Sequence, residues 1–164
     1  MAAAAVPQSI ASLDRARTKG AARHLAARVA LARMEAIKRG VYVALGFEGR
    51  GTAVSFAMFA DGNRNGVRTR DIERGIDRRI DSPVRLADQF PGVTYGLTPA
   101  AGGGDPLRIG SSRLLSISPV GTATSGTLYV RGRDGTQLGV RVTGATGRTR
   151  LLRYDERSRQ WMDF

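Results

Sequence analysis

The segment from Gln8 to Arg39 constrains the fold more than any other part of the chain, because it has the pattern of one long helix. It is rich in Ala, Arg and Leu and has no internal proline. Its apolar residues recur at spacings of three and four, which places them on one face of an α-helix. They are Leu25, Val29, Ala32 and Ala36, flanked by Ala30, Met34, Ile37 and Val41. A continuous helix would be roughly 45 Å long at about 1.5 Å per residue, which is long for 164 residues.

Basic residues occupy the remaining faces of this predicted helix. They are Arg15, Arg17, Arg23, Arg28, Arg33 and Lys38. Gly20 is a weak point at which the helix could bend, and Gly40, which follows Lys38 and Arg39, is a stop signal. We expect the helix to end at Gly40. We also expect its N-terminal half to extend beyond the sheet that covers the rest, and so to need another partner.

After Gly40 the period of the sequence changes from helical to strand-like. Segments 41–47 and 52–59 are rich in Val, Phe and Tyr and are separated by EGRG, which predicts a β-hairpin. The strongest hairpin signal is TLYVRGRDGTQLGVRV, in which two alternating arms flank Asp134 and Gly135. Further strands are predicted at PGVTYGL, SRLLSISP and TRLLRYD. Segment 61–81 and the loop PAAGGGDP are predicted to be unstructured surface loops.

Together these elements predict an α+β fold, with a long N-terminal α-helix packed on an antiparallel β-sheet of six or seven short strands. Residues 1–40 would form the helical part and residues 41–164 the globular, β-rich part. The length suits one domain with a single hydrophobic core. The chain has no cysteine, which excludes disulfides, thiolate metal sites and a thiol nucleophile.

The charge of the chain indicates an acidic partner. The 26 Lys and Arg residues exceed the 14 Asp and Glu residues, giving a formal net charge of +12. Such an excess favours nucleic acid, anionic lipid headgroups or an acidic protein face. No run of about 20 apolar residues is present to span a bilayer. The opening MAAAAVP is too short for the apolar part of a signal peptide, and it has the composition of the tail of a segment that has been cut away.

The stretch DGNRNGVRTRDI, residues 61–72, is compatible with two structures. Its first six residues match the calcium-loop pattern D-x-[DN]-x-[DN]-G, but Ile72 stands where a bidentate carboxylate is required. Arg68 occupies the position that usually holds an apolar residue. The alternative is a surface turn stabilised by Asp and Asn side chains. If Ca²⁺ were bound, its ligands would be Asp61, Asn63, Asn65, Asp71 and the carbonyl group of Val67, and no other cofactor is predicted.

Enzymatic function is not predicted. The single histidine, His24, lies within the predicted helix, where a packed or exposed side chain is expected. Ser111 and Ser112 have no histidine nearby in sequence and lack the glycines of a nucleophile elbow. The glycines at 102–104 precede Asp105 and Pro106 rather than Lys-Ser/Thr, so they do not form a phosphate-binding loop. We therefore expect no catalytic residues.

Three stretches resemble the GspH/FimT family of minor pseudopilins and minor type IV pilins. Residues 2–40 are similar to the distal half of a pilin spine, with a bend at Pro7 and the phrase AR-x-EAI-x-R at 32–39. ISPVGTATSGTLYVRGRDG resembles the family's F-x-P-x-G turn and the hairpin that follows it. VRVTGATGRTR resembles the closing strand, with its Gly-Arg-x-Arg ending at residues 147–150. The resemblance covers about two thirds of the chain.

The resemblance implies a structural subunit of a type II secretion pseudopilus or a type IV pilus, acting by filament assembly. The helical stripe of Leu25, Val29, Ala32 and Ala36 would pack against the helices of other pilin subunits. Family members begin with a short basic leader, a peptidase site and about 20 apolar residues, and they are methylated. Because these features are missing, we expect this sequence to be the soluble part of an inner-membrane-anchored, single-pass precursor. Its β-rich domain would lie in the periplasm, and in the filament after assembly.

A DNA-binding role is the alternative. In FimT-like minor pilins of DNA-uptake pili the Gly-Arg-x-Arg stretch is implicated in gripping DNA, which the resemblance carries to Arg148 and Arg150. Alternate strand residues share a face, so these two would project as a pair able to straddle phosphates. Arg153 follows in the same tract and completes the predicted DNA-binding set, and Tyr154 and Trp161 could stack on bases. A solvated basic strand edge explains the same residues without DNA.

Overall fold

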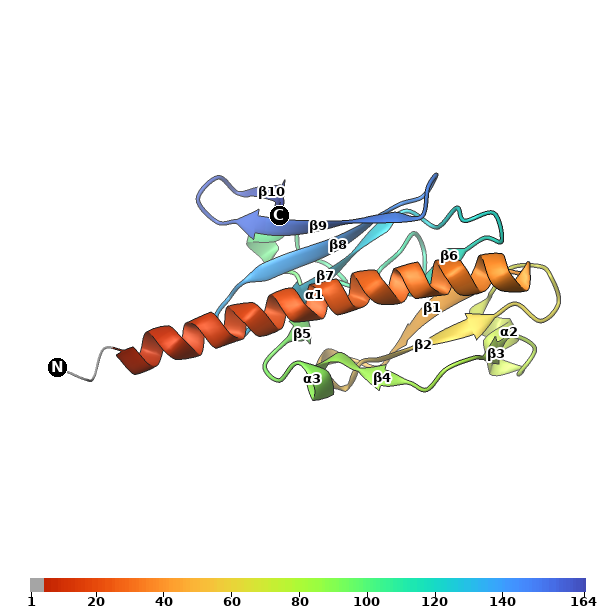
Figure 1. Ribbon diagram of the computed structural model, residues 1–164, viewed down its shortest axis with the longest axis horizontal. Helices are drawn as coiled ribbons and strands as arrows, with labels where there is room; N and C mark the ends of the chain where they lie inside the picture. Colours follow the sequence, from red (N-terminus) through yellow and green to blue (C-terminus); the bar gives the residue numbers. More distant parts are fainter. Residues whose placement is uncertain (1–4) are drawn as a thin grey trace.

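The computed structural model describes residues 5–164, with side chains from residue 10 onward. One helix, α1 (Ala5–Arg39), runs along two antiparallel sheets (Figure 1). Its 35 residues correspond to about 52 Å at about 1.5 Å per residue. The helix continues through Pro7 and Gly20, where the sequence predicts bends. Pro7 lies in the first turn, where proline removes no intrahelical hydrogen bond. Gly20 lets the ring of Phe90 pack against the helix, because a Cβ at position 20 would lie 2.9 Å from that ring.

The predicted C-terminal end of the helix is confirmed. Gly40 has a φ of +66°, a conformation that residues with a side chain rarely adopt. Its backbone N–H donates to the carbonyl oxygen of Ala36 at 3.0 Å, which closes the last turn. The chain can therefore reverse direction at once and enter the first strand.

The first sheet contains the first predicted hairpin. Strands β1 (Val43–Glu48) and β2 (Ser55–Ala60) pair antiparallel, with Val43 opposite Ala60, and η1 (Gly51–Ala53) joins them. The predicted strand at SRLLSISP is β6 (Leu114–Ile117), which pairs with the other edge of β1. Two short strands, β3 (Arg78–Arg79) and β4 (Val84–Arg85), pair with β2. The order is β3-β2-β1-β6, with β4 on β2 beside β3.

The second sheet has the order β10-β9-β8-β7-β5 and contains the C-terminal half of the chain. Its strands are β5 (Thr94–Tyr95), β7 (Gly126–Arg131), β8 (Gln137–Thr143), β9 (Arg148–Asp155) and β10 (Gln160–Asp163). The predicted hairpin at Asp134 and Gly135 is confirmed as the turn between β7 and β8, and Gly135 has a φ of +88°.

The described residues form ten strands in two sheets, rather than six or seven. The strands that were not predicted are β3, β4 and β10; β3 and β4 have only two residues each, too few for a hydropathy pattern, whereas β5 lies within the predicted strand PGVTYGL. Segment 61–81, predicted to be unstructured, contains α2 (Thr69–Glu73) as well as β3. The remaining short elements are α3 (Leu86–Gln89) and η2 (Pro99–Ala101).

The core lies between α1 and the inner faces of both sheets. The stripe of Leu25, Val29, Ala32 and Ala36 is fully buried there. It packs against both sheets, and Leu115 of β6 belongs to the same core cluster. The prediction that this stripe packs on the helices of other subunits is therefore wrong, because the protein's own sheets already cover it. Helical periodicity identifies an apolar face, but it does not show which surface buries that face.

The part of α1 without sheet cover is shorter than the predicted half. Burial continues toward the N-terminus through Thr18 to Asp14, both of which are below 9% exposed. The first turns of α1 project past the sheets (Figure 1). Ile10 and Leu13 on these turns are 55% and 50% exposed. Within residues 5–164, no helix combines the length and apolar character needed to cross a membrane.

Candidate functional site

The side of α1 that faces away from the sheets carries exposed apolar residues. We call this surface the outer helix face; its described members are Leu13, Ala16, Ala27, Ala30, Met34 and Ile37, all exposed. Met34 and Ile37 are 64% and 48% exposed, which is high for side chains of this size and polarity. Arg23 and Lys38, both exposed, lie among them in sequence. The outer helix face is therefore an apolar strip with basic residues interspersed.

A second candidate surface is the outer face of the second sheet, where arginines of two strands meet. Arg148 and Arg150 alternate along β9 and are both exposed, so they share a face as predicted. Arg150 lies directly opposite Arg141 of β8. Arg141 was not among the predicted DNA-binding residues. Like charges in directly opposite positions destabilise a sheet. The one carboxylate near them, that of Asp163, lies 3.7 Å from Arg150 and is largely exposed, so it offsets little of this repulsion.

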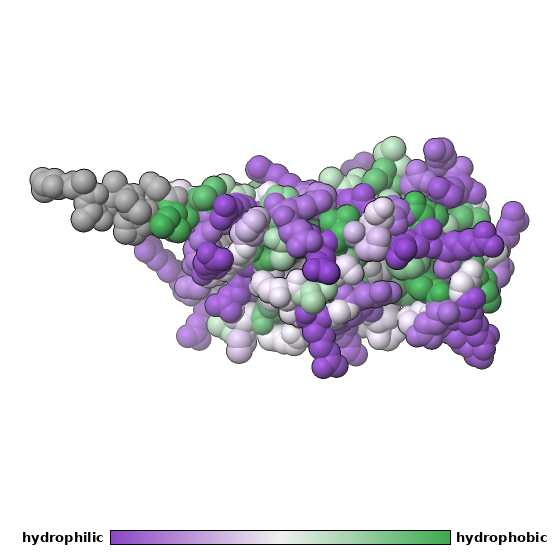
Figure 2. Space-filling model, turned by 90° about the horizontal axis from the view of Figure 1, so that it is seen from below, coloured by the Kyte–Doolittle hydropathy of each residue, from purple (hydrophilic) through white to green (hydrophobic). Residues whose placement is uncertain are grey.

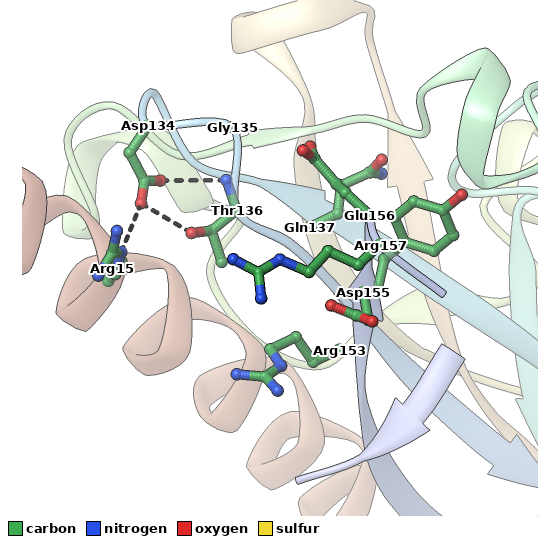
Figure 3. A pocket seen from close by; sticks show the side chains of 10 residues that line it. Arg15, Asp134, Gly135, Thr136, Gln137, Arg153, Asp155, Glu156 and Arg157 are labelled. Carbon is green, nitrogen blue, oxygen red and sulfur yellow. Dashed lines mark hydrogen bonds and ion pairs between the residues drawn. The ribbon is translucent and has the colours of Figure 1, made fainter. Parts of the chain in front are cut away.

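Arg153 does not join the other two arginines of the predicted set. It is an odd-numbered residue of β9, so it projects from the face opposite to Arg148 and Arg150. It lines a groove with Arg15 of α1 and Arg157 of the following turn (Figure 3). The structure thus divides the predicted DNA-binding residues between two surfaces.

The aromatic residues near this tract pack on one another. Tyr154 is 9% exposed, and its hydroxyl group donates to the carbonyl oxygen of Ala100 at 2.6 Å. The Trp161 indole N–H donates to the carbonyl oxygen of Ala101 at 3.2 Å. The Trp161 ring also lies 5.1 Å from the ring of Tyr129 and 5.3 Å from that of Tyr154. Tyr154 is therefore not available to stack on a nucleic-acid base.

The stretch at 61–72 is organised by carboxylates that accept backbone hydrogen bonds. Asp61, which is 5% exposed, accepts from the N–H groups of Asn63, Arg64 and Gly66 at 3.1, 2.7 and 2.7 Å. Asp77 accepts from the N–H groups at 62 and 68 at 3.0 and 2.9 Å. These bonds are those of the turn stabilised by Asp and Asn side chains.

The remaining predicted calcium ligands lie near one another in this loop. The side-chain amides of Asn63 and Asn65 lie 3.5 and 3.3 Å from one carboxylate oxygen of Asp71. Over residues 5–164, no three His, Cys, Asp or Glu side chains converge as a metal ion would require. Calcium binding by this loop stays a prediction that a titration must test.

His24 lies in a packed environment between two phenylalanine rings. Its ring centroid is 6.1 Å from that of Phe56 and 5.7 Å from that of Phe90. Burial, together with the charge of Arg28, lowers its pKa below the usual value of 6.5. In the described part of the chain, its Nε2 atom is buried without a hydrogen-bond partner. These features are those of a core histidine.

Comparison with known families gives one match. The model of a family described as Type II transport protein GspH matches residues 21–147, well over half of the chain. The matched residues include the buried stripe of α1 and the hairpin around Gly135, and they end one residue before Arg148. Neither the curated proteins nor the solved structures that were compared include a match to the chain.

Proposed function

The chain belongs to the GspH/FimT family of minor pseudopilins, and from this premise we propose that it assembles with other pilin-like subunits through the outer helix face of α1. Its β-rich part would lie in the periplasm and on the outside of the filament. In this arrangement α1 has two functions: one face forms the core of the domain, and the other contacts neighbouring subunits.

The exposed apolar residues of the outer helix face carry this proposal. Large apolar side chains such as Met34 and Ile37 gain free energy when a second surface removes them from water. The exposed alanines at 27 and 30 would let the backbone of a neighbouring helix approach closely. No element of the described chain covers this strip.

The net charge indicates which subunits fit. Copies of a chain with a charge of +12 repel each other, so a filament made only of this chain is disfavoured. Neighbours with less positive or acidic surfaces avoid this repulsion. A minor subunit, placed among different pilin-like proteins, matches that requirement.

A site-directed cross-link tests the proposal. Because the chain has no cysteine, an Ala30→Cys variant carries a single thiol on the outer helix face. When it is expressed with the pilin-like subunits of its own system, we expect a thiol-reactive cross-linker to join it to one of them. Ala145→Cys, in an exposed turn of the second sheet, is the matched control. Equal cross-linking at the two positions, or none at position 30, would contradict the proposal.

DNA binding is a second candidate function, favoured by the facing arginines of β8 and β9. Three exposed guanidinium groups, those of Arg141, Arg148 and Arg150, lie on one sheet face and have little compensating charge. Phosphates suit such a cluster because a guanidinium group can donate two parallel hydrogen bonds. If these arginines contact three phosphates, affinity for duplex DNA should fall roughly 40-fold between 50 and 200 mM salt, from a slope of about −0.9 per phosphate.

An Arg148→Ala, Arg150→Ala variant separates this function from assembly alone. We expect it to lose DNA binding in a gel-shift assay at low salt while it keeps the cross-link at position 30. Binding as tight as that of the parent chain would remove the DNA-binding hypothesis.

A further inference from the structure

We propose that four arginines at the end of the domain from which α1 projects bind the phosphate groups of anionic phospholipids. We call these residues, Arg131, Arg133, Arg153 and Arg157, the basic collar. The inference extends the proposed function, since it assigns a membrane-facing surface to the subunit before assembly. Its arginines differ from those of the proposed DNA-binding cluster, and it shares one apolar residue, Leu13, with the outer helix face.

The basic collar comes from two hairpins whose turns lie at the same end of the domain. Strand β7 ends at Arg131, and Arg133 follows in the turn to β8. Strand β9 reaches the same end with Arg153, and Arg157 lies in the turn to β10. Both turns lie where α1 projects from the sheets (Figure 1). On the face shown in Figure 2, hydrophilic residues gather beside the helix at this end.

The collar arginines line two grooves, of which the first includes a residue of α1. Arg153 and Arg157 line the first together with Arg15, and their guanidinium groups point toward the helix (Figure 3). Arg131 and Arg133 line the second, which has no acidic residue in its lining. Arg153 and Arg157 are therefore directed toward α1, whereas Arg131 lies on the same sheet face as Arg141 and lines a groove to which α1 contributes no residue.

The collar arginines form no ion pair within the described chain, although the charge of Arg153 contributes to lowering the pKa of Asp155. The ion pairs of residues 10–164 involve other basic residues, so none of the four lies within 4 Å of a carboxylate oxygen. The acids of the first groove are mostly engaged elsewhere. Asp134 is held by Arg15 at 3.4 Å and by the Thr136 hydroxyl at 2.7 Å. Asp155 accepts from the N–H and hydroxyl groups of Ser158 at 3.0 and 2.7 Å.

Glu156 also lines the first groove, so the excess positive charge there is modest. Over both grooves together, this excess is the difference between the four collar guanidinium groups, which form no ion pair among the described residues, and the carboxylate of Glu156, which also forms none. A guanidinium group is weakly hydrated and matches the geometry of phosphate, so an anionic headgroup is a suitable ligand.

The exposed apolar residues beside the collar favour a membrane over a nucleic acid. Leu13 and Ile10, about half exposed, lie on α1 just beyond Arg15 toward the N-terminus. Apolar side chains next to cationic ones are typical of segments that rest in the headgroup region, where the former enter the acyl boundary and the latter bind phosphates. A nucleic-acid backbone would contact the arginines but would leave these apolar residues in water.

Vesicle co-sedimentation of the 164-residue chain tests the inference. We expect binding to vesicles that contain phosphatidylglycerol and little binding to phosphatidylcholine alone. An Arg153→Gln, Arg157→Gln variant should bind roughly 30-fold more weakly, from about a fivefold loss per basic residue near an anionic surface. The matched control is Arg148→Gln, Arg150→Gln, which removes the same charge from the other end and the other face of the same strand. It should bind within about twofold of the parent chain.

A second pair of variants tests the apolar contribution. Leu13→Ser should weaken vesicle binding, while Met34→Ser, at the far end of the same helix, should not. Equal losses in the two arginine variants would show that net charge alone drives binding and would overturn the inference. So would a collar variant that loses duplex DNA binding but keeps vesicle binding, since the collar would then be a nucleic-acid site. The cross-link at position 30 is measured without lipid, so either result can fail without the other.

Discussion

Replacing Leu25 by alanine distinguishes a helix face that forms the core from one that contacts other subunits. Leu25 is fully buried between α1 and the sheets. A buried Leu→Ala change lowers the free energy of unfolding by about 2–5 kcal/mol, through lost burial and the cavity left behind. We expect about 3 kcal/mol. For a domain of this size that corresponds to a decrease in Tm of roughly 6–12 °C.

The measurement is urea denaturation followed by circular dichroism, with Met34→Ala as the matched control. Met34 is 64% exposed on the opposite side of the same helix. Alanine has a slightly higher helix propensity, so the free energy of unfolding should change by less than about 0.5 kcal/mol. The same Met34→Ala change should reduce cross-linking from a thiol at position 30 to a neighbouring subunit, because it removes an apolar contact at the proposed interface.

The opposite pattern would refute this assignment of the two faces. If Leu25→Ala unfolds at the same urea concentration as the parent chain, the stripe is not part of the core of the domain. If Met34→Ala is strongly destabilised, the outer helix face is buried within the subunit. Either result would restore the interpretation in which the stripe of Leu25 is the intermolecular face.

Three further predictions concern charged and titratable side chains. Burial lowers the pKa of His24 in the folded protein, so the unfolded chain binds a proton on this histidine more tightly. The free energy of unfolding should therefore be largest above about pH 6.5 and should decrease below it. In urea titrations, His24→Leu should flatten this dependence between about pH 7 and pH 5. Asp81 pairs with Arg28 and both are mostly buried, so Asp81→Asn should lower the free energy of unfolding by about 2 kcal/mol, whereas Glu35→Gln, in an exposed ion pair of α1, should leave it nearly unchanged. Asp61→Ala, which leaves three backbone N–H groups without their acceptor, should lower Tm by several degrees in differential scanning fluorimetry. In the same assay Ca²⁺ should leave the parent Tm unchanged, and a rise would support the calcium loop instead.

Much of the architecture follows from local sequence patterns. The long helix, its end at Gly40 and both hairpins were predicted, because helical periodicity, a glycine in the left-handed region and an Asp-Gly turn act over a few neighbouring residues. The two-residue strands β3 and β4 were missed. They exist only because β2 offers an unpaired edge, and no pattern within their own residues records that edge.

On the candidate surfaces, too, some features were predicted from local sequence patterns and others depend on tertiary contacts. The pairing of Arg148 with Arg150 on one face was predicted from strand alternation, but the placement of Arg141 opposite Arg150 depends on the register of β8 and β9. The prediction that Arg153 joins that pair was wrong, because position 153 is five residues from 148 and strand alternation places it on the opposite face. The burial of Tyr154 depends on the loop that carries Ala100, which is far away in sequence.

By itself, the sequence determined that this protein has one long helix with an apolar stripe, a β-rich domain, a strongly basic charge and the motifs of its family. These properties depend on residue types and on short spacings. Only the tertiary structure decided which helix face is buried, which arginines lie together and which charges have no partner. Those outcomes depend on contacts between segments that are distant in the chain, because a side chain's partner is set by how the sheets pack and register around the helix.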